Sequence, residues 1–110
     1  MVHRLRDHLR QQGGRYVTVA EAAKTVGLST SRASARFREE AGGSLKRFLD
    51  RERGRVAGQL VVFSDLTFKQ IAYRMGFGDL FSFSRFFKRL HGASPRKLRA
   101  KGLPNVRRDR

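Results

Sequence analysis

The sequence contains 110 residues, within the size range of a single domain, and its 25 Lys and Arg against nine Asp and Glu give a formal net charge of +16. Such an excess favours a polyanionic partner, with nucleic acid first and an anionic membrane surface second. A chain without cysteine has no disulfide or thiolate metal site, and no apolar stretch is long enough for a signal peptide or a membrane span. We therefore expect a soluble, cytoplasmic protein without a membrane partner.

Helical periodicity dominates the start of the chain, and strand alternation is scarce. The apolar residues Val2, Leu5 and Leu9 share one face of a first helix, which the glycines at 13–14 end. Thr18 then opens a second helix with Glu21 three residues further on, the spacing of a capping box.

Gly27 fits the end of this second helix, where glycine adopts a left-handed backbone at little cost. Ser29 is a candidate N-cap for a third helix over residues 30–41, which Gly42 ends. Two helices joined by a glycine turn, the second polar on one face, are typical of a helix-turn-helix motif.

A long helix is expected from Ser44 to about Phe63. Gly54 and Gly58 lie inside it and each costs about 1 kcal/mol relative to alanine; a hinge, a tolerated local weakness and close packing all remain open as reasons for them. The stripe that we expect to be buried consists of Leu45, Phe48, Leu49, Val56 and Leu60.

The second half of the chain repeats the first. Thr67 and Gln70 form a second capping box, Gly76 occupies the place of the turn glycine, and Asp79 is the candidate N-cap of a helix over residues 80–91. The offset is 49 residues from Thr18 to Thr67 and 50 residues from Gly42 to Gly92. Two copies of one basic unit indicate two helix-turn-helix motifs.

Ser94 and Pro95 open a short last helix with serine at the cap and proline in the first turn. The expected fold is all-α, with about seven helices and two helix-turn-helix subdomains joined by a long linker helix. A linker of about 19 residues spans roughly 28 Å, which approaches the spacing of about 34 Å between successive major grooves of B-DNA. The expected parts are 1–47, the first helix-turn-helix subdomain; 48–63, the linker helix; 64–100, the second subdomain; and 101–110, a flexible basic tail.

The helix over residues 80–91 has one apolar side and one side that faces outward. Phe81 stands out on the second side: it could contact a thymine methyl group, pack on the neighbouring module or simply be exposed, while Arg85 could bind guanine or a phosphate. The wheel places Phe83, Phe86, Phe87 and Leu90 in the core, Phe81, Ser84, Arg85 and Lys88 outside, and Leu80 and Ser82 at the margins.

The outward face of the helix over residues 30–41 carries short side chains, so direct base readout by this helix is expected to be sparse. Its arginines suit phosphates, which position a protein without reading sequence; a charged face that only contacts solvent is the alternative. The face consists of Ser31, Ser34, Ala35 and Arg38, with Arg32 and Arg36 beside it.

Catalysis finds no support in the sequence. His3, His8 and His91 have no partner at metal-ligand spacing, and neither a nucleophile elbow nor a glycine-rich phosphate loop is present. We expect no enzyme activity, no metal, no cofactor and no small-molecule ligand.

Two stretches carry a family resemblance: the segment from Asp65 through Gln70-Ile-Ala and Gly76-Phe77 to Asp79, and the segment from Phe83 through Gly92-Ala-Ser-Pro95 to Arg99. Over residues 5–100 the chain resembles the DNA-binding domain of the AraC/XylS family of bacterial transcription regulators. The resemblance implies two helix-turn-helix motifs that read adjacent major grooves of a promoter, with groove-facing positions at Ser31, Ser34, Ala35, Leu80, Phe81, Ser82, Ser84 and Arg85.

The chain departs from the family pattern at three positions. Ala33 replaces a large aliphatic residue, which predicts a looser first core, and Leu80 and Phe81 stand where polar residues are common. The separate ligand-sensing or dimerisation domain of most members is absent from the sequence, so it resembles either a short single-domain member or the C-terminal part of a larger one.

These observations predict a transcription regulator that binds double-stranded DNA sequence-specifically, is monomeric on its own, and has RNA polymerase as a further candidate partner. The alternatives are a non-specific basic nucleic-acid-binding protein and an interaction module that docks on polymerase or another regulator. The candidate base contacts are Ser31, Arg32, Ser34, Ala35, Leu80, Phe81, Ser82, Ser84 and Arg85, and the candidate phosphate contacts are Arg36, Arg38, Thr67, Lys88, Arg89 and Arg96.

Overall fold

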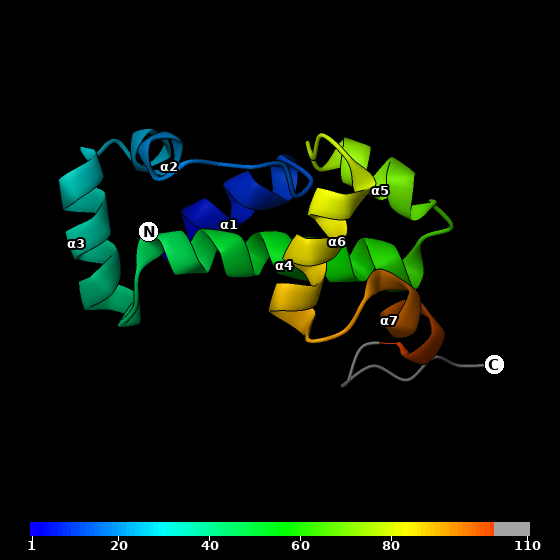
Figure 1. Ribbon diagram of the computed structural model, residues 1–110. Coiled ribbons are helices and arrows are strands. Elements are labelled where there is room, and N and C mark those ends of the chain that lie inside the picture. The colour runs from blue at the N-terminus through cyan, green and yellow to red at the C-terminus, as the bar shows by residue number, and fades with distance from the viewer. Residues whose placement is uncertain (103–110) are drawn as a thin grey trace. The chain divides into compact units, whose positions relative to one another are not determined.

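A computed structural model describes residues 1–102; residues 103–110, which make up most of the expected tail, lie outside the described residues. Residues 1–102 form seven helices and no strand, which confirms the predicted all-α class (Figure 1). Lys101, at the expected start of the tail, still belongs to the last helix. The helices are α1 (Val2–Gln11), α2 (Val19–Thr25), α3 (Thr30–Ala41), α4 (Leu45–Phe63), α5 (Phe68–Arg74), α6 (Leu80–His91) and α7 (Pro95–Lys101).

The chain divides into two compact units, Met1–Arg53 and Gly54–Arg110. The boundary falls inside α4, so each unit takes a part of the long helix. In the first unit α2 packs against both α1 and α3, and in the second unit α6 packs against both α5 and α7. In each unit a short turn joins the two helices of a helix-turn-helix motif, α2 to α3 and α5 to α6 (Figure 1).

The first unit has a core of side chains from α1 to α4. Ala33 is completely buried in it, and the rings of Phe37 and Phe48 pack with centroids 4.9 Å apart. Burial of a side chain as large as phenylalanine contributes about 1.5–3 kcal/mol to stability. The buried residues of this core are Leu5, Leu9, Val17, Ala22, Ala23, Ala33, Phe37, Leu45, Phe48 and Leu49.

The second unit has a core of its own, and the part of α4 that enters it differs from the prediction. Val56 is only half-buried, and Leu60 is half-buried but packs against this core, whereas Ala57, Val61 and Val62 are buried. The prediction selected large side chains, but the face that α4 turns inward here is set by close packing and includes small residues. The buried residues of this core are Ala57, Val61, Val62, Ile71, Ala72, Met75, Phe83, Phe86, Phe87 and Leu98.

Gly54 in α4 is explained by close packing. A Cβ atom at this position would lie 2.6 Å from Cδ1 of Leu90, closer than real side chains approach. His91, one residue further along α6, also places Nε2 2.8 Å from the Gly54 carbonyl oxygen. Of the three reasons left open by the sequence, the structure therefore supports close packing of α6 on α4 at Gly54.

Both predicted capping boxes are present. The Thr18 hydroxyl accepts a hydrogen bond from the Glu21 amide at 3.0 Å, and the Glu21 carboxylate accepts one from the Thr18 amide at 3.1 Å. Thr67 and Gln70 form the same pair of bonds at 3.0 and 2.8 Å. Each box satisfies amides that the first turn of a helix leaves without a partner.

The two turn glycines also play equivalent roles. Gly27 and Gly76 have φ angles of +72° and +87°. The amide of the residue that follows each glycine donates back across the helix end: that of Leu28 to the Ala23 carbonyl at 3.0 Å, and that of Phe77 to the Ala72 carbonyl at 2.9 Å. This is the Schellman arrangement, and it sets the direction in which α3 and α6 start.

Two arginines form hydrogen bonds inside the units. Arg53 donates from Nε to the Gly14 carbonyl at 2.9 Å, and its burial lowers its pKa. Arg99 donates to two carbonyls, from Nε to Val61 at 2.6 Å and from an Nη atom to Leu66 at 2.8 Å. Two of the basic side chains thus stabilise the fold through hydrogen bonds to backbone carbonyls.

Candidate nucleic-acid interface

Helix α6 is the second helix of the second helix-turn-helix motif, and its outward face carries an exposed aromatic side chain. Phe83 and Phe87 are fully buried, whereas Phe81 is 68% exposed. The guanidinium carbon of Arg85 lies 5.2 Å from the centroid of the Phe81 ring, within the range of a cation–π contact. Two side chains one helical turn apart thus form a single exposed unit that combines an apolar surface with hydrogen-bond donors.

The start of α6 is fixed by Asp79. Its Oδ1 accepts a hydrogen bond from the Ser82 amide at 2.6 Å, and its Oδ2 lies 3.3 Å from the Ser82 hydroxyl. These bonds lower the pKa of Asp79, and the charge of Arg85 acts in the same direction. Of the candidate base contacts on this helix, Leu80, Phe81 and Arg85 are exposed, and Ser82 and Ser84 are half-buried.

Helix α3 is the second helix of the first helix-turn-helix motif, and its N-cap is Ser29, whose hydroxyl accepts from the Arg32 amide at 3.2 Å. Ser31 and Ala35 are exposed on it, and Ser34 is half-buried. The complete burial of Ala33 shows that the small side chain leaves no opening to solvent at this position. Arg32, Arg36 and Arg38 are all exposed, and none of them forms an ion pair within residues 1–102.

The remaining candidate phosphate contacts lie on the second unit. Lys88, Arg89 and Arg96 are exposed, and Arg89 lies over the Phe86 ring at 5.8 Å. Thr67 is committed to its capping box: its amide donates to Gln70 and its hydroxyl oxygen accepts from Gln70. Of the hydrogen-bond donors of Thr67, only the hydroxyl proton therefore remains available for a phosphate.

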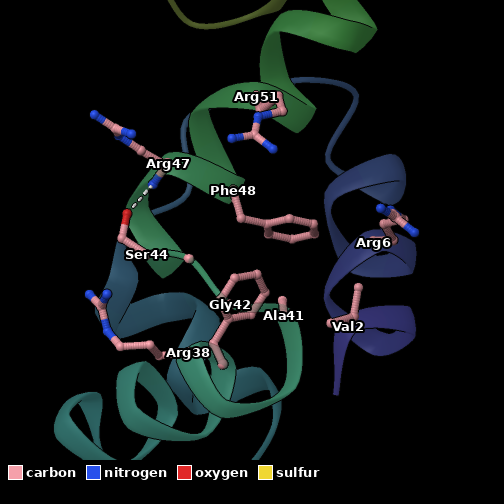
Figure 2. Close-up of a pocket in the computed structure, with 11 residues that line it drawn as sticks. Val2, Arg6, Arg38, Ala41, Gly42, Ser44, Arg47, Phe48 and Arg51 are labelled. Atoms are coloured by element: carbon pink, nitrogen blue, oxygen red, sulfur yellow. Dashed lines mark hydrogen bonds between the residues drawn. The ribbon is translucent and has the colours of Figure 1, made fainter.

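A recess of about 730 Å³ on the first unit was not expected from the sequence. We call it the arginine recess because four arginines line it: Arg6 of α1, Arg38 near the end of α3, and Arg47 and Arg51 of α4. Phe48 lies among them (Figure 2). Its other lining residues are Val2, Phe37, Ala41, Gly42, Gly43, Ser44 and Phe48.

Sequence reasoning identified only Arg38 of these four arginines, as a phosphate contact. A signal was present in the repeat: the residues 50 positions after Arg38, Arg47 and Arg51 are Lys88, Lys97 and Lys101. Three basic positions are therefore common to both copies.

Within residues 1–102, no group of three or more histidine or acidic residues could hold a metal ion. No helix of this part of the chain is long and apolar enough to cross a membrane.

A family model described as a helix-turn-helix domain matches residues 22–101. The transcriptional activator RhaS of Klebsiella pneumoniae is 34% identical over 95 residues, which cover 86% of this chain and 33% of that protein. The chain belongs to the AraC/XylS family. The arabinose operon regulatory protein of Salmonella typhimurium is 34% identical over 94 residues, which cover 86% of this chain and 32% of that protein. This AraC/XylS chain thus spans about a third of the length of both relatives.

Two solved structures share the fold of this chain. The C-terminal domain of AraT, a response regulator from Geobacillus stearothermophilus, aligns with a TM-score of 0.77 and 26% identity, over 98% of this chain and 90% of that one. The DNA-binding domain of AdpA, solved with a target DNA, aligns with a TM-score of 0.76 and 24% identity, over 91% and 90% of the two chains. At that identity, the second likeness concerns the fold alone.

Proposed function

We propose that the chain is the DNA-binding module of a bacterial transcription regulator and reads double-stranded DNA sequence-specifically with α3 and α6. The observation that carries this proposal is the pair of equivalent recognition helices. Each is fixed at its start by a side-chain cap and buries one face, while basic residues are exposed on the other. Such a helix fits the major groove of B-DNA, which is about 12 Å wide.

The two helices have unequal capacity for base recognition. On α6, Phe81 offers an apolar surface to a thymine methyl group, and Arg85 offers a fork of donors to guanine O6 and N7. On α3, Ser31, Ser34 and Ala35 are short, so this helix relies on close approach and on its arginines. We therefore propose a non-palindromic site in which the half contacted by α6 is the more strictly specified.

The roles of the relatives support a regulatory function. RhaS is a transcriptional activator and the Salmonella relative is an operon regulator, as their names state. For this chain we propose promoter binding in the bacterial cytoplasm, by a monomer that acts through binding and not through catalysis. RNA polymerase is a further proposed partner.

Selection of bound duplexes from a random library, followed by sequencing, tests the proposal directly. We expect one enriched motif that spans two helical turns if both helices read. A motif of one turn would mean that only one helix reads, and the absence of any enriched motif would favour non-specific binding driven by charge. With about six to ten phosphates neutralised, affinity should fall about 10³–10⁵-fold between 50 and 200 mM salt.

Charge reversal on α6 separates DNA reading from docking on a protein. The change Arg85→Glu with Lys88→Glu should abolish binding to the selected duplex, because both cations are exposed on the outward face. The same reversal at Arg4 and Arg10, which are exposed on α1 and outside the candidate contacts, is the matched control. Retained duplex binding by the α6 variant together with lost partner binding would support the interaction module instead.

A further inference from the structure

The arginine recess lacks the acidic residues that would balance its charge. Arg6 has a partner, with Nε 3.6 Å from an Oε atom of the buried Glu52. Arg38, Arg47 and Arg51 are exposed, and none of the three forms an ion pair within residues 1–102. Three cations that line one concave surface repel one another unless an anion lies between them. The charge balance of the recess thus favours an anionic ligand.

The backbone of the recess adds to this preference. Helix α4 starts there, with the Ser44 hydroxyl accepting from the Arg47 amide at 3.1 Å (Figure 2), and its first turn contains no acidic residue. The start of a 19-residue helix carries partial positive charge and amides without internal partners. A Cβ atom on Gly42 or Gly43 would contact nothing within 4 Å, so the backbone beside this helix start is open to a ligand.

The repeat indicates which anion the recess takes. The two copies differ at the base-reading positions, where Ser31 and Ala35 of the first copy correspond to Phe81 and Arg85 of the second. Both copies are basic at three positions of the recess, whose equivalents in the second copy are residues 88, 97 and 101. Phosphate contacts position a protein on DNA, whereas base contacts specify the sequence. A basic position that is common to two copies with different base-reading residues therefore indicates a phosphate contact.

The side-chain type fits the same ligand. All four cations of the recess are arginines, and the guanidinium fork matches two oxygens of one phosphate. Arg38 lies three residues after Ala35, about 4.5 Å further along the α3 axis. A duplex whose bases meet Ser31 and Ala35 would therefore bring its backbone toward the end of α3, where Arg38 lines the recess.

We propose that the arginine recess is a phosphate-binding site, filled by a backbone phosphate of the duplex that α3 reads. The source of the phosphate rests on the DNA binding proposed above, whereas the phosphate chemistry rests on the recess alone. A free phosphorylated small molecule would offer the same chemistry, and the experiment below distinguishes the two sources.

The test uses the full chain and two double variants that each remove two positive charges from the first unit. Arg47→Gln with Arg51→Gln alters the recess, and Arg4→Gln with Arg15→Gln alters exposed arginines outside it. On the selected duplex we expect the recess variant to bind about tenfold more weakly at 50 mM salt. The slope of log affinity against log salt should fall by about 0.9, the value for one lost phosphate contact, and the enriched motif should not change. The control variant should lose less than half as much in affinity and in slope. An equal loss in both variants would overturn the duplex as the source.

A scan with single neutral methylphosphonates along the duplex then locates the phosphate. The unaltered chain should lose affinity at one position next to the half-site read by α3, and the recess variant should lose nothing more at that position. Failure of every position to couple in this way would also overturn the duplex as the source.

Titration with inorganic pyrophosphate, followed by the arginine Nε–H signals in NMR spectra, tests the chemistry without DNA. Saturable shifts of Arg38, Arg47 and Arg51 in the unaltered chain and in the control, with the Arg38 shift lost in the recess variant, would support the phosphate site. With no methylphosphonate coupling, the same shifts would assign the site to a free phosphate. The absence of both shifts and coupling would refute the inference. If the chain enriched no duplex motif, the function proposed above would fail separately, and the titration alone would decide on the recess.

Discussion

The turn glycines allow a sharp test of the repeated fold. Gly27 and Gly76 have positive φ angles, while Gly43 and Gly78 do not, and a Cβ atom at any of the four would contact nothing within 4 Å. Alanine at each position therefore adds no clash. Replacing glycine also removes freedom from the unfolded chain, which stabilises a protein by about 0.4–1 kcal/mol where the backbone is compatible. The four variants thus differ only in whether alanine must adopt a left-handed backbone.

That backbone costs an L-residue about 1–2 kcal/mol. We expect Gly27→Ala and Gly76→Ala each to destabilise the chain by about 0.5–1 kcal/mol after the gain from the unfolded state. Gly43→Ala and Gly78→Ala should stabilise it by about 0.4–1 kcal/mol. Within each unit, the free energies of unfolding of the turn variant and its control should then differ by the cost of the left-handed backbone, about 1–2 kcal/mol.

Urea denaturation followed by circular dichroism measures these differences, and 1 kcal/mol corresponds to roughly 4–8 °C in melting temperature for a domain of this size. The two turn variants lie in different units, so their effects should add within about 0.5 kcal/mol. Turn variants as stable as their controls would show that neither turn depends on a left-handed glycine and that Gly27 and Gly76 are not structurally required.

Three further predictions concern the second unit. Phe81→Ala should weaken binding to the selected duplex. Replacing the contacted thymine by deoxyuridine should cost the unaltered chain about 0.8 kcal/mol of binding free energy, the value of one methyl-sized group, and should cost the variant nothing. An equal loss of binding free energy in both chains would exclude the methyl contact. Arg99→Ala should lower the free energy of unfolding by about 2–3 kcal/mol, because charge-assisted hydrogen bonds to Val61 and Leu66 are lost; an unchanged urea midpoint would contradict this. Since the pKa of Asp79 is lowered in the folded chain, its stabilising effect is full above the unfolded pKa of about 3.9 and is lost as the pH falls through the folded value. Asp79→Asn, which keeps a capping side chain, should therefore melt with a weaker dependence on pH below about 4 than the unaltered chain.

The helix bounds could be predicted from the sequence because caps are local. Thr18 with Glu21 and Ser29 with Arg32 are each three residues apart, and both bonds form where the pattern placed them. The same holds for α6, which begins after Asp79 as expected. Helix starts that depend on a cap within one short segment were therefore predicted correctly.

Long-range packing could not be predicted in this way. The carbonyl partners of Arg99 lie 33 and 38 residues away along the chain, and the sequence offers no sign of them. The inward face of α4 near Val56 was wrongly assigned because the approach of α6 to Gly54, and not side-chain size, determines it. The arginine recess was missed for a similar reason, since its arginines come from three helices and the comparison of the two copies indicates only three of the four.

The caps also distribute negative charge differently in the two units. In the first, a carboxylate lies at the start of α2, through Glu21, and the recognition helix α3 begins with the neutral Ser29. In the second, α5 has the neutral Gln70, and the carboxylate of Asp79 lies at the start of the recognition helix α6. The macrodipole of α3 is therefore uncompensated at its N-terminus, whereas that of α6 faces an anion. The start of α3 therefore keeps the partial positive charge of its helix, whereas at the start of α6 the Asp79 carboxylate offsets that charge.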